Sequence, residues 1–231
     1  MRKHLCILVT CILCVCLCGC TSEAAENVMG KIDALEEISI SQDELIDNFS
    51  ESLATMKEKA SELDEIFVEY SALEDKEKEQ VTNFDKYELV QNQYNQIIDE
   101  NASDIYIVAL IQDYEDRELM KLTLDIFGEK MPSEQKQELY AQYVFYEEAP
   151  EYLDNYIQQS LLSPSSYRRY SVELTSFLTP YGNGKFSGTF KVRFGASNAY
   201  GAEVTKTVSG MLTFSVNVEN GTIRFTDVFM M

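Results

Sequence analysis

The sequence predicts an α+β protein in which an acidic helical bundle precedes a helix and an antiparallel sheet of three or four strands. Hydrophobic residues recur every three or four positions in residues 41–148, the period of amphipathic helices, and alternate with polar residues in several later segments, as in half-buried strands. The charge changes at the same point. Residues 20–149 hold 33 Asp and Glu against 10 Lys and Arg, whereas residues 150–231 hold 6 acidic and 7 basic residues. We therefore expect an acidic helical domain at 41–148 and an α+β domain at 149–231.

The amino terminus has the pattern of a secretory signal peptide. Arg2 and Lys3 precede an apolar run over residues 5–18, and small residues follow it. Such a run is shorter than the roughly 20 residues that a helix needs to span a bilayer. A short basic stretch followed by a short apolar core is typical of a cleaved signal peptide. We assign this role to residues 1–19.

Leu17, Cys18, Gly19 and Cys20 resemble the lipobox of bacterial lipoproteins, which has an aliphatic residue, two small residues and an obligatory Cys. The resemblance implies that Cys20 becomes the first residue after cleavage and receives a diacylglyceryl group. The acyl chains, such as palmitate, would then hold the protein on the outer face of the bacterial cytoplasmic membrane. The alternative is a cleaved peptide that releases a secreted protein.

Cysteine and histidine are confined to the first twenty residues. All six Cys lie between Cys6 and Cys20, and the single histidine is His4. The mature chain therefore lacks the residues for a disulfide within itself, for Ser-His or Cys-His nucleophile pairs, and for His- or Cys-ligated metals. We expect no metal, no cofactor and no catalytic site, and we retain a carboxylate-based hydrolase only as an alternative.

Residues 20–40 are small, polar and acidic, and we interpret them as a lipidated tether. Ser41 and Glu44 then fit a capping box that opens a helix. A second helix, capped by Asp85, would pack along the first. The apolar stripe of the first helix has heptad spacing over Ile46, Phe49, Leu53, Met56, Ala60, Leu63, Phe67 and Tyr70. The stripe of the second comprises Leu89, Val90, Tyr94, Ile97 and Ile98.

Residues 70–86 resemble a helical module repeated in many Gram-positive surface proteins, with its Tyr, Leu and Glu-Lys-x-x-Val-x-Asn core. The resemblance extends over about residues 31–100 and implies a spacer or adhesive bundle without catalytic residues. A third helical stretch would start at Asp104 and restart after Pro132. Its tyrosine stripe (Tyr140, Tyr143 and Tyr146) favours core packing over sugar stacking.

Beyond residue 149 the pattern changes from helix to strand. Pro150 is expected to open a helix that ends before Pro164. Strands follow at residues 186–194, 204–216 and 223–225, and the turns at residues 182–184 and at Asn220 and Gly221 favour hairpins. The helix would cover the apolar face of the meander.

Residues 161–166 and 197–202 resemble segments of a small α+β domain common in exported Gram-positive proteins, whose biochemical role is unassigned. Asn198, Tyr200 and Gly201 form a candidate structural turn in which Gly201 takes a positive φ and Tyr200 lies over the sheet end. A ligand-binding turn is the alternative.

Lys191 and Arg193 form a candidate binding face, because side chains two positions apart on a strand point to the same side. They would recognise an anionic envelope polymer or protein, or else solubilise the sheet and pair with Glu203. The acidic surface excludes nucleic acid as a partner. The function predicted is a lipid-anchored, non-catalytic binding module on a helical spacer. The alternative is a structural envelope protein without a specific ligand.

Overall fold

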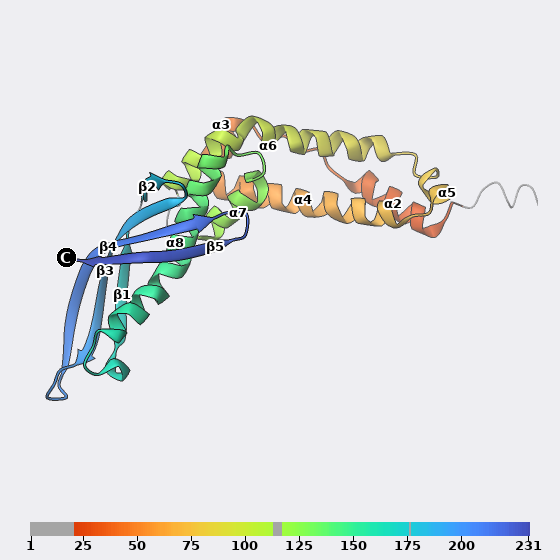
Figure 1. Cartoon of the computed structure of the whole chain (residues 1–231). Helices are drawn as coiled ribbons and strands as arrows, with labels where there is room; N and C mark the ends of the chain where they lie inside the picture. The colour runs from red at the N-terminus through yellow and green to blue at the C-terminus, as the bar shows by residue number, and fades with distance from the viewer. Residues whose placement is uncertain (1–20, 113–116, 176) are drawn as a thin grey trace, which may run out of the picture. The chain divides into compact units, whose positions relative to one another are not determined.

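A computed structural model describes residues 21–231 except 113–116 and 176. The chain forms two compact units: one joins the described residues up to Ile40 with Ala54–Ile97, and the other joins Ser41–Leu53 with Ile98–Met231. The fold is α+β, with helices followed by an antiparallel sheet, as predicted (Figure 1). Cys20 and the predicted signal peptide lie outside the described residues.

The first unit begins with helix α2 (Glu23–Ala34), so the interpretation of residues 20–40 as a tether is wrong for this stretch. Ser22 caps the helix, since its Oγ accepts a hydrogen bond from the Ala25 amide at 3.0 Å. Ala25 and two later residues of α2, Val28 and Ile32, are buried at helical spacing. Their apolar stripe is short, and the surrounding acidic residues obscure it in the sequence.

Helices α4 (Phe49–Ala72) and α6 (Phe84–Gln112) contribute their facing segments to the first unit, joined through α5 (Asp75–Lys78) (Figure 1). The stripe predicted for α4 holds at Met56 and Leu63, but Ile66 is buried where Phe67 was expected, and Phe67 is 50% exposed. The buried face of α4 therefore continues from Leu63 to Ile66 by a three-residue step, where the predicted stripe has a four-residue step to Phe67.

Three predicted helix boundaries between residues 41 and 112 are wrong. The helix that starts after Ser41 is two helices, α3 (Gln42–Asp47) and α4, because Asn48 leaves helical geometry at φ −116° and ψ 43°. Asp85 lies inside the first turn of α6. Asp104 caps no helix, since α6 runs through it to Gln112, and its carboxylate instead accepts a hydrogen bond from Gln42.

In the second unit, α7 (Arg117–Phe127) precedes α8 (Ser133–Gln159). Pro150 lies inside α8 and opens no new helix, so the predicted boundary at 148–149 falls within a continuous helix. A proline inside a helix removes one backbone hydrogen bond. Packing offsets this loss, because Ala149 and Leu153 on either side of Pro150 are fully buried in the core beneath the helix.

The sheet has five antiparallel strands where three or four were predicted. They are β1 (Arg168–Leu174), β2 (Thr179–Gly182), β3 (Lys185–Ser197), β4 (Glu203–Asn217) and β5 (Thr222–Met230). Their order is β1-β3-β4-β5, and β2 pairs with the other end of β3 on the same side as β1. Strands β1 and β2 lack the clean alternation of β3, and a short 3₁₀ helix, Pro164–Ser166, precedes them.

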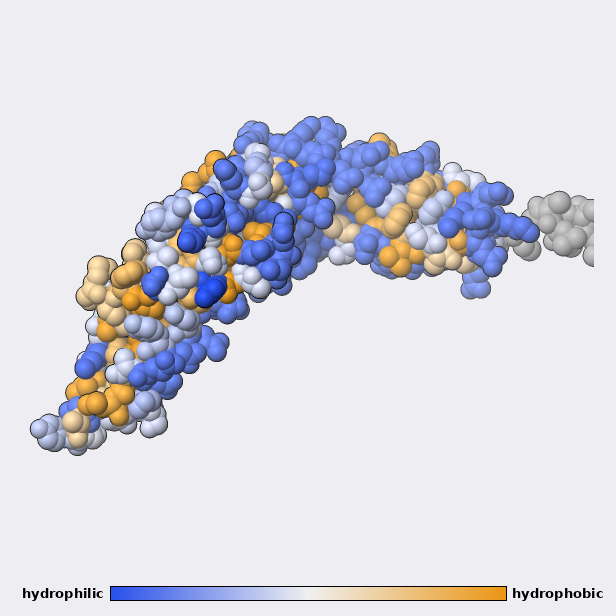
Figure 2. Space-filling view, in the orientation of Figure 1, coloured by the Kyte–Doolittle hydropathy of each residue, from blue (hydrophilic) through white to orange (hydrophobic). Residues whose placement is uncertain are grey.

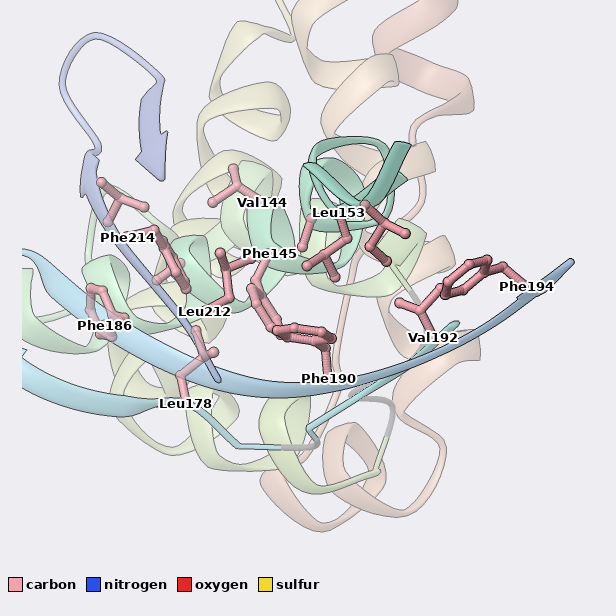
Figure 3. Close-up of a cluster of buried hydrophobic side chains, with 14 of the residues drawn as sticks. Val144, Phe145, Leu153, Leu178, Phe186, Phe190, Val192, Phe194, Leu212 and Phe214 are labelled. Atoms are coloured by element: carbon pink, nitrogen blue, oxygen red, sulfur yellow. The ribbon is translucent and has the colours of Figure 1, made fainter. Parts of the chain in front are cut away.

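Helix α8 covers one face of the sheet and forms the main core of the second unit (Figure 3). Phe145 of α8 is fully buried and stacks on Phe214 of β4, with ring centroids 5.3 Å apart and planes 8° from parallel. It occupies the space left by Gly188 of β3. Tyr152, on the next turns of α8, stacks on Phe225 of β5. The predicted tyrosine stripe also joins this core through Tyr140 and Tyr143.

The visible outward surface of α6 is mostly hydrophilic (Figure 2), in keeping with the excess of acidic residues in the helical part of the sequence. Over the described residues, no helix combines the length and apolar character needed to cross a membrane.

Candidate functional site

A cleft of about 730 Å³ lies between α8 and the edge strand β1 in the second unit. Its volume falls within the range of ligand pockets, roughly 300–1,000 Å³. The cleft is more polar than most such pockets, since six of its ten lining residues are charged. It is lined by Arg117, Tyr146, Glu147, Pro150, Glu151, Asp154, Arg169, Val172, Glu173 and Leu174.

One wall of the cleft is an acidic stripe of α8. Glu147, Glu151 and Asp154 follow one another at four- and three-residue steps, which places them on one face of the helix. Pro150 lies among them and lines the same wall. The helix thus buries its Phe145 face against the sheet and presents three carboxylates to the cleft.

Two arginines neutralise the ends of this stripe. Arg117 Nη1 lies 2.8 Å from Glu147 Oε2, and Arg169 Nη1 lies 2.9 Å from Asp154 Oδ2. Arg169 also donates to the Pro150 carbonyl at 3.1 Å, so it ties β1 to α8 across the cleft. Glu151, between the two pairs, makes no ion pair with any other described residue and is exposed. The centre of the wall therefore carries an uncompensated negative charge.

Two tyrosine hydroxyls donate hydrogen bonds to groups beside the cleft. Tyr167 donates a hydrogen bond to Asp154 Oδ1 at 2.5 Å, and Tyr146 donates to the Thr175 carbonyl at 2.7 Å. Burial, together with the hydrogen bond to Asp154, raises the pKa of Tyr167 far above its ordinary value. The Tyr167 hydroxyl holds Asp154 in position through this hydrogen bond.

The other wall is the free edge of β1. Glu173 faces Lys191 and Ser171 faces Arg193 on β3, and just beyond the strand the Thr175 amide donates to the Thr189 carbonyl. Hydrogen-bonded and non-hydrogen-bonded pairs alternate in an antiparallel ladder, so the N–H and C=O groups of Val172 and Leu174 point away from β3. No hydrogen bond joins these groups to another part of the described chain. They face solvent beside the cleft.

The predicted binding face, Lys191 and Arg193, lies on the sheet face opposite α8, outside the cleft. Both side chains are exposed, and they alternate with the buried Val192 and Phe194 as predicted. Lys191 pairs with Glu173 at 3.1 Å rather than with Glu203. Glu203 instead accepts a hydrogen bond from the Tyr170 hydroxyl.

The segment of Asn198, Tyr200 and Gly201 forms a tight turn between β3 and β4. Asn198 Oδ1 accepts hydrogen bonds from the amides of Tyr200 and Ala202 at 2.9 and 3.0 Å, and Gly201 has a φ of +78°. Tyr200 does not lie over the sheet end, because the turn directs its side chain outward and leaves it 95% exposed. Local hydrogen bonds of Asn198 account for the whole turn.

Two of the carboxylates that line the cleft are largely open to solvent. A glycosidase needs a carboxyl group kept protonated by burial, whereas the side chains of Glu147 and Glu173 are 49% and 63% exposed. In the part of the chain that the structure describes, no group of three His, Cys, Asp or Glu side chains is placed to hold a metal ion.

Sequence reasoning missed the cleft because its two walls come from segments interpreted separately. The signal in α8 is the spacing of Glu147, Glu151 and Asp154, but the predicted helix start at Pro150 divides this stripe. The strand wall was missed because β1 itself was not predicted.

No protein family, curated protein or solved structure matches this chain. The resemblances to bacterial lipoproteins, to the helical module and to the small α+β domain therefore stay predictions from the motifs.

Proposed function

We propose that this protein is a lipid-anchored, non-catalytic binding module of the bacterial cell surface, and that the cleft between α8 and β1 is its binding site. The observation that carries the proposal is the cleft itself, a space of about 730 Å³ with an unpaired carboxylate at the centre of one wall. The lipobox ending at Cys20 supports the anchor and the location on the outer face of the cytoplasmic membrane.

The helices of the first unit act as a spacer in this proposal. Their ion pairs and packing are those of a stable bundle, with Lys31 of α2 bridging Glu65 and Glu69 of α4. They carry an acidic surface, which keeps a protein soluble and repels nucleic acid. The binding role therefore falls to the second unit, where the cleft lies.

The test compares two charge reversals on α8 in residues 20–231 with Cys20→Ser, which gives a lipid-free chain. Glu151→Lys reverses the unpaired charge inside the cleft, and Glu148→Lys reverses an exposed charge that does not line it. Each chain is immobilised and incubated with detergent-solubilised envelope material, and the bound components are identified by mass spectrometry. We expect a set of components that the unsubstituted chain and Glu148→Lys retain and that Glu151→Lys loses. Identical retention by all three chains would refute the cleft as the binding site.

A second candidate site is the polar face with Lys191 and Arg193, which would bind an anionic envelope component. Arg193 supports it as an exposed cation without an ion pair among the described residues, although Lys191 is already paired with Glu173. Replacing both cations with Gln tests it on immobilised anionic cell-wall polymer. Loss of retention that is steepest at low salt would favour this face, and unchanged retention would leave it a solvated sheet surface.

A further inference from the structure

The free edge of β1 and the acidic wall of α8 together define what the cleft can hold. The outward N–H and C=O groups of Val172 and Leu174 offer two donors and two acceptors, and the two residues lie about 7 Å apart along the strand. This is the hydrogen-bonding pattern that an additional β-strand satisfies. A small anion could use only the donors, and it would face the carboxylates of α8.

The side chains that line the cleft offer an added strand both apolar contact and a negative charge. Val172 and Leu174 are half-buried at the margin of the core and line the cleft beside Pro150, so they offer apolar contact. Glu151 lies on the facing helix without an ion pair to another described residue. A strand side chain that approaches Glu151 gains most from a positive charge, because a charge-assisted hydrogen bond is stronger than a neutral one.

We propose that the cleft binds an extended peptide segment of a partner protein, which adds to β1 as a further strand and places a Lys or Arg against Glu151. This inference rests on the proposed binding role of the cleft and specifies its ligand. Backbone hydrogen bonds to Val172 and Leu174 supply the affinity, and the acidic stripe of α8 selects basic over acidic sequences.

The experiment uses residues 20–231 with Cys20→Ser and a fluorescein-labelled, end-blocked hexapeptide of alternating Lys and Val as the probe. Hexapeptides of alternating Gln and Val, and of alternating Glu and Val, are the comparison probes. Fluorescence anisotropy gives the dissociation constants. We expect the Lys peptide to bind at least tenfold more tightly than the Gln peptide, and the Glu peptide to bind most weakly.

Proline substitution tests strand addition separately from charge. Val172→Pro removes an outward amide and leaves the ladder to β3 intact, which an edge strand tolerates. Val228→Pro is the matched control on β5, the opposite edge of the sheet. Because the Met231 amide donates to the Ser209 carbonyl, alternation along β5 directs the Val228 amide away from β4. Circular dichroism of both variants confirms that each is folded.

We expect Val172→Pro to weaken binding of the Lys peptide at least tenfold and Val228→Pro to leave it within twofold. Glu151→Gln is expected to weaken binding of the Lys peptide about tenfold and to leave binding of the Gln peptide unchanged, with Glu148→Gln as its control.

If Val172→Pro binds the Lys peptide as the unsubstituted chain does while Glu151→Gln weakens binding, strand addition is wrong and the cleft remains a binding site. If the hexapeptides do not bind, the inference fails, while the envelope retention comparison still tests the proposed function. If the unsubstituted chain forms concentration-dependent dimers and Val172→Pro abolishes them, the peptide proposal is wrong. The occupant of the cleft is then a second copy of this chain.

Discussion

Phe145 and Gly188 provide the sharpest test of how α8 is held on the sheet. A Cβ atom at Gly188 would lie 2.5 Å from Phe145 Cζ and 2.9 Å from Leu178 Cδ2, well inside the 3.5–4.0 Å that carbon atoms prefer. The Phe145 ring has no room to withdraw, because it is fully buried and stacks on Phe214. Gly188 does not have a positive φ, so alanine is allowed there conformationally, and the clash is its only cost.

The magnitudes follow from this geometry. Gly188→Ala overpacks the core and should lower the free energy of unfolding by about 1–3 kcal/mol. Phe145→Ala leaves a cavity and should lower it by about 3–5 kcal/mol. In the double variant the new methyl group enters the space vacated by the ring. The double variant should therefore be more stable than the sum of the single changes predicts, by about 0.5–3 kcal/mol.

Urea unfolding followed by far-ultraviolet circular dichroism gives the four free energies, and amide hydrogen exchange in β3 assigns the transition to the sheet unit. The unsubstituted chain and the two single variants complete the double-mutant cycle. If the two losses in free energy of unfolding add to within about 0.5 kcal/mol in the double variant, the Phe145 ring and a methyl group at position 188 do not compete for the same space. That result would refute the packing described for α8.

Further predictions concern the anchor, the extent of the sheet unit and the cleft. Cys20→Ser should abolish metabolic acyl labelling and move the protein out of the membrane fraction, whereas unchanged fractionation would refute the lipid anchor. Residues 133–231 should show cooperative unfolding and residues 150–231 should not, because the shorter fragment lacks the α8 residues that pack on the sheet; equal thermal transitions would contradict this. Tyr167→Phe should lower the free energy of unfolding at pH 7 by about 1–2 kcal/mol through the lost hydrogen bond to Asp154. Because folding raises the pKa of Tyr167, this contribution is present below its ordinary pKa of about 10 and is lost as the pH rises through the higher folded value. Urea unfolding between pH 7 and 11 should show the difference shrinking, and a constant difference would argue against the raised pKa.

The parts of the fold that the sequence predicted are those with strong periodicity. The alternation from Phe186 to Phe194 predicted both the strand and the exposure of Lys191 and Arg193, since one face of the sheet is buried beneath α8. The turn at Asn198 was also predicted, because an Asn side chain that bonds its own backbone depends only on neighbouring residues. Sequence periodicity and turn chemistry predict the structure correctly at these positions, because tertiary packing does not oppose the local signal there.

The errors lie where tertiary packing outweighs a local signal. Pro150 favours a helix start, yet burial of Ala149 and Leu153 keeps α8 continuous through it. Asp104 favours a helix cap, but the neighbouring Ala102 and Ile105 are buried and α6 continues. The cleft could not be predicted because it depends on the register of β1 against β3 and on the rotation of α8, neither of which is a local property of the sequence.

The two edges of the sheet differ in a way that favours recognition at β1. Strand β1 carries charged side chains and an irregular pairing at Tyr170, between Arg169 and Ser171, and both features discourage uncontrolled strand pairing. Strand β5 exposes Phe229 and Met230 instead. A charged edge accepts another strand only when that strand brings complementary charge, because unpaired charges in the new contact are costly. The acidic wall of α8 beside β1 sets this requirement. The free backbone groups of β1 therefore favour a basic peptide segment over neutral and acidic segments.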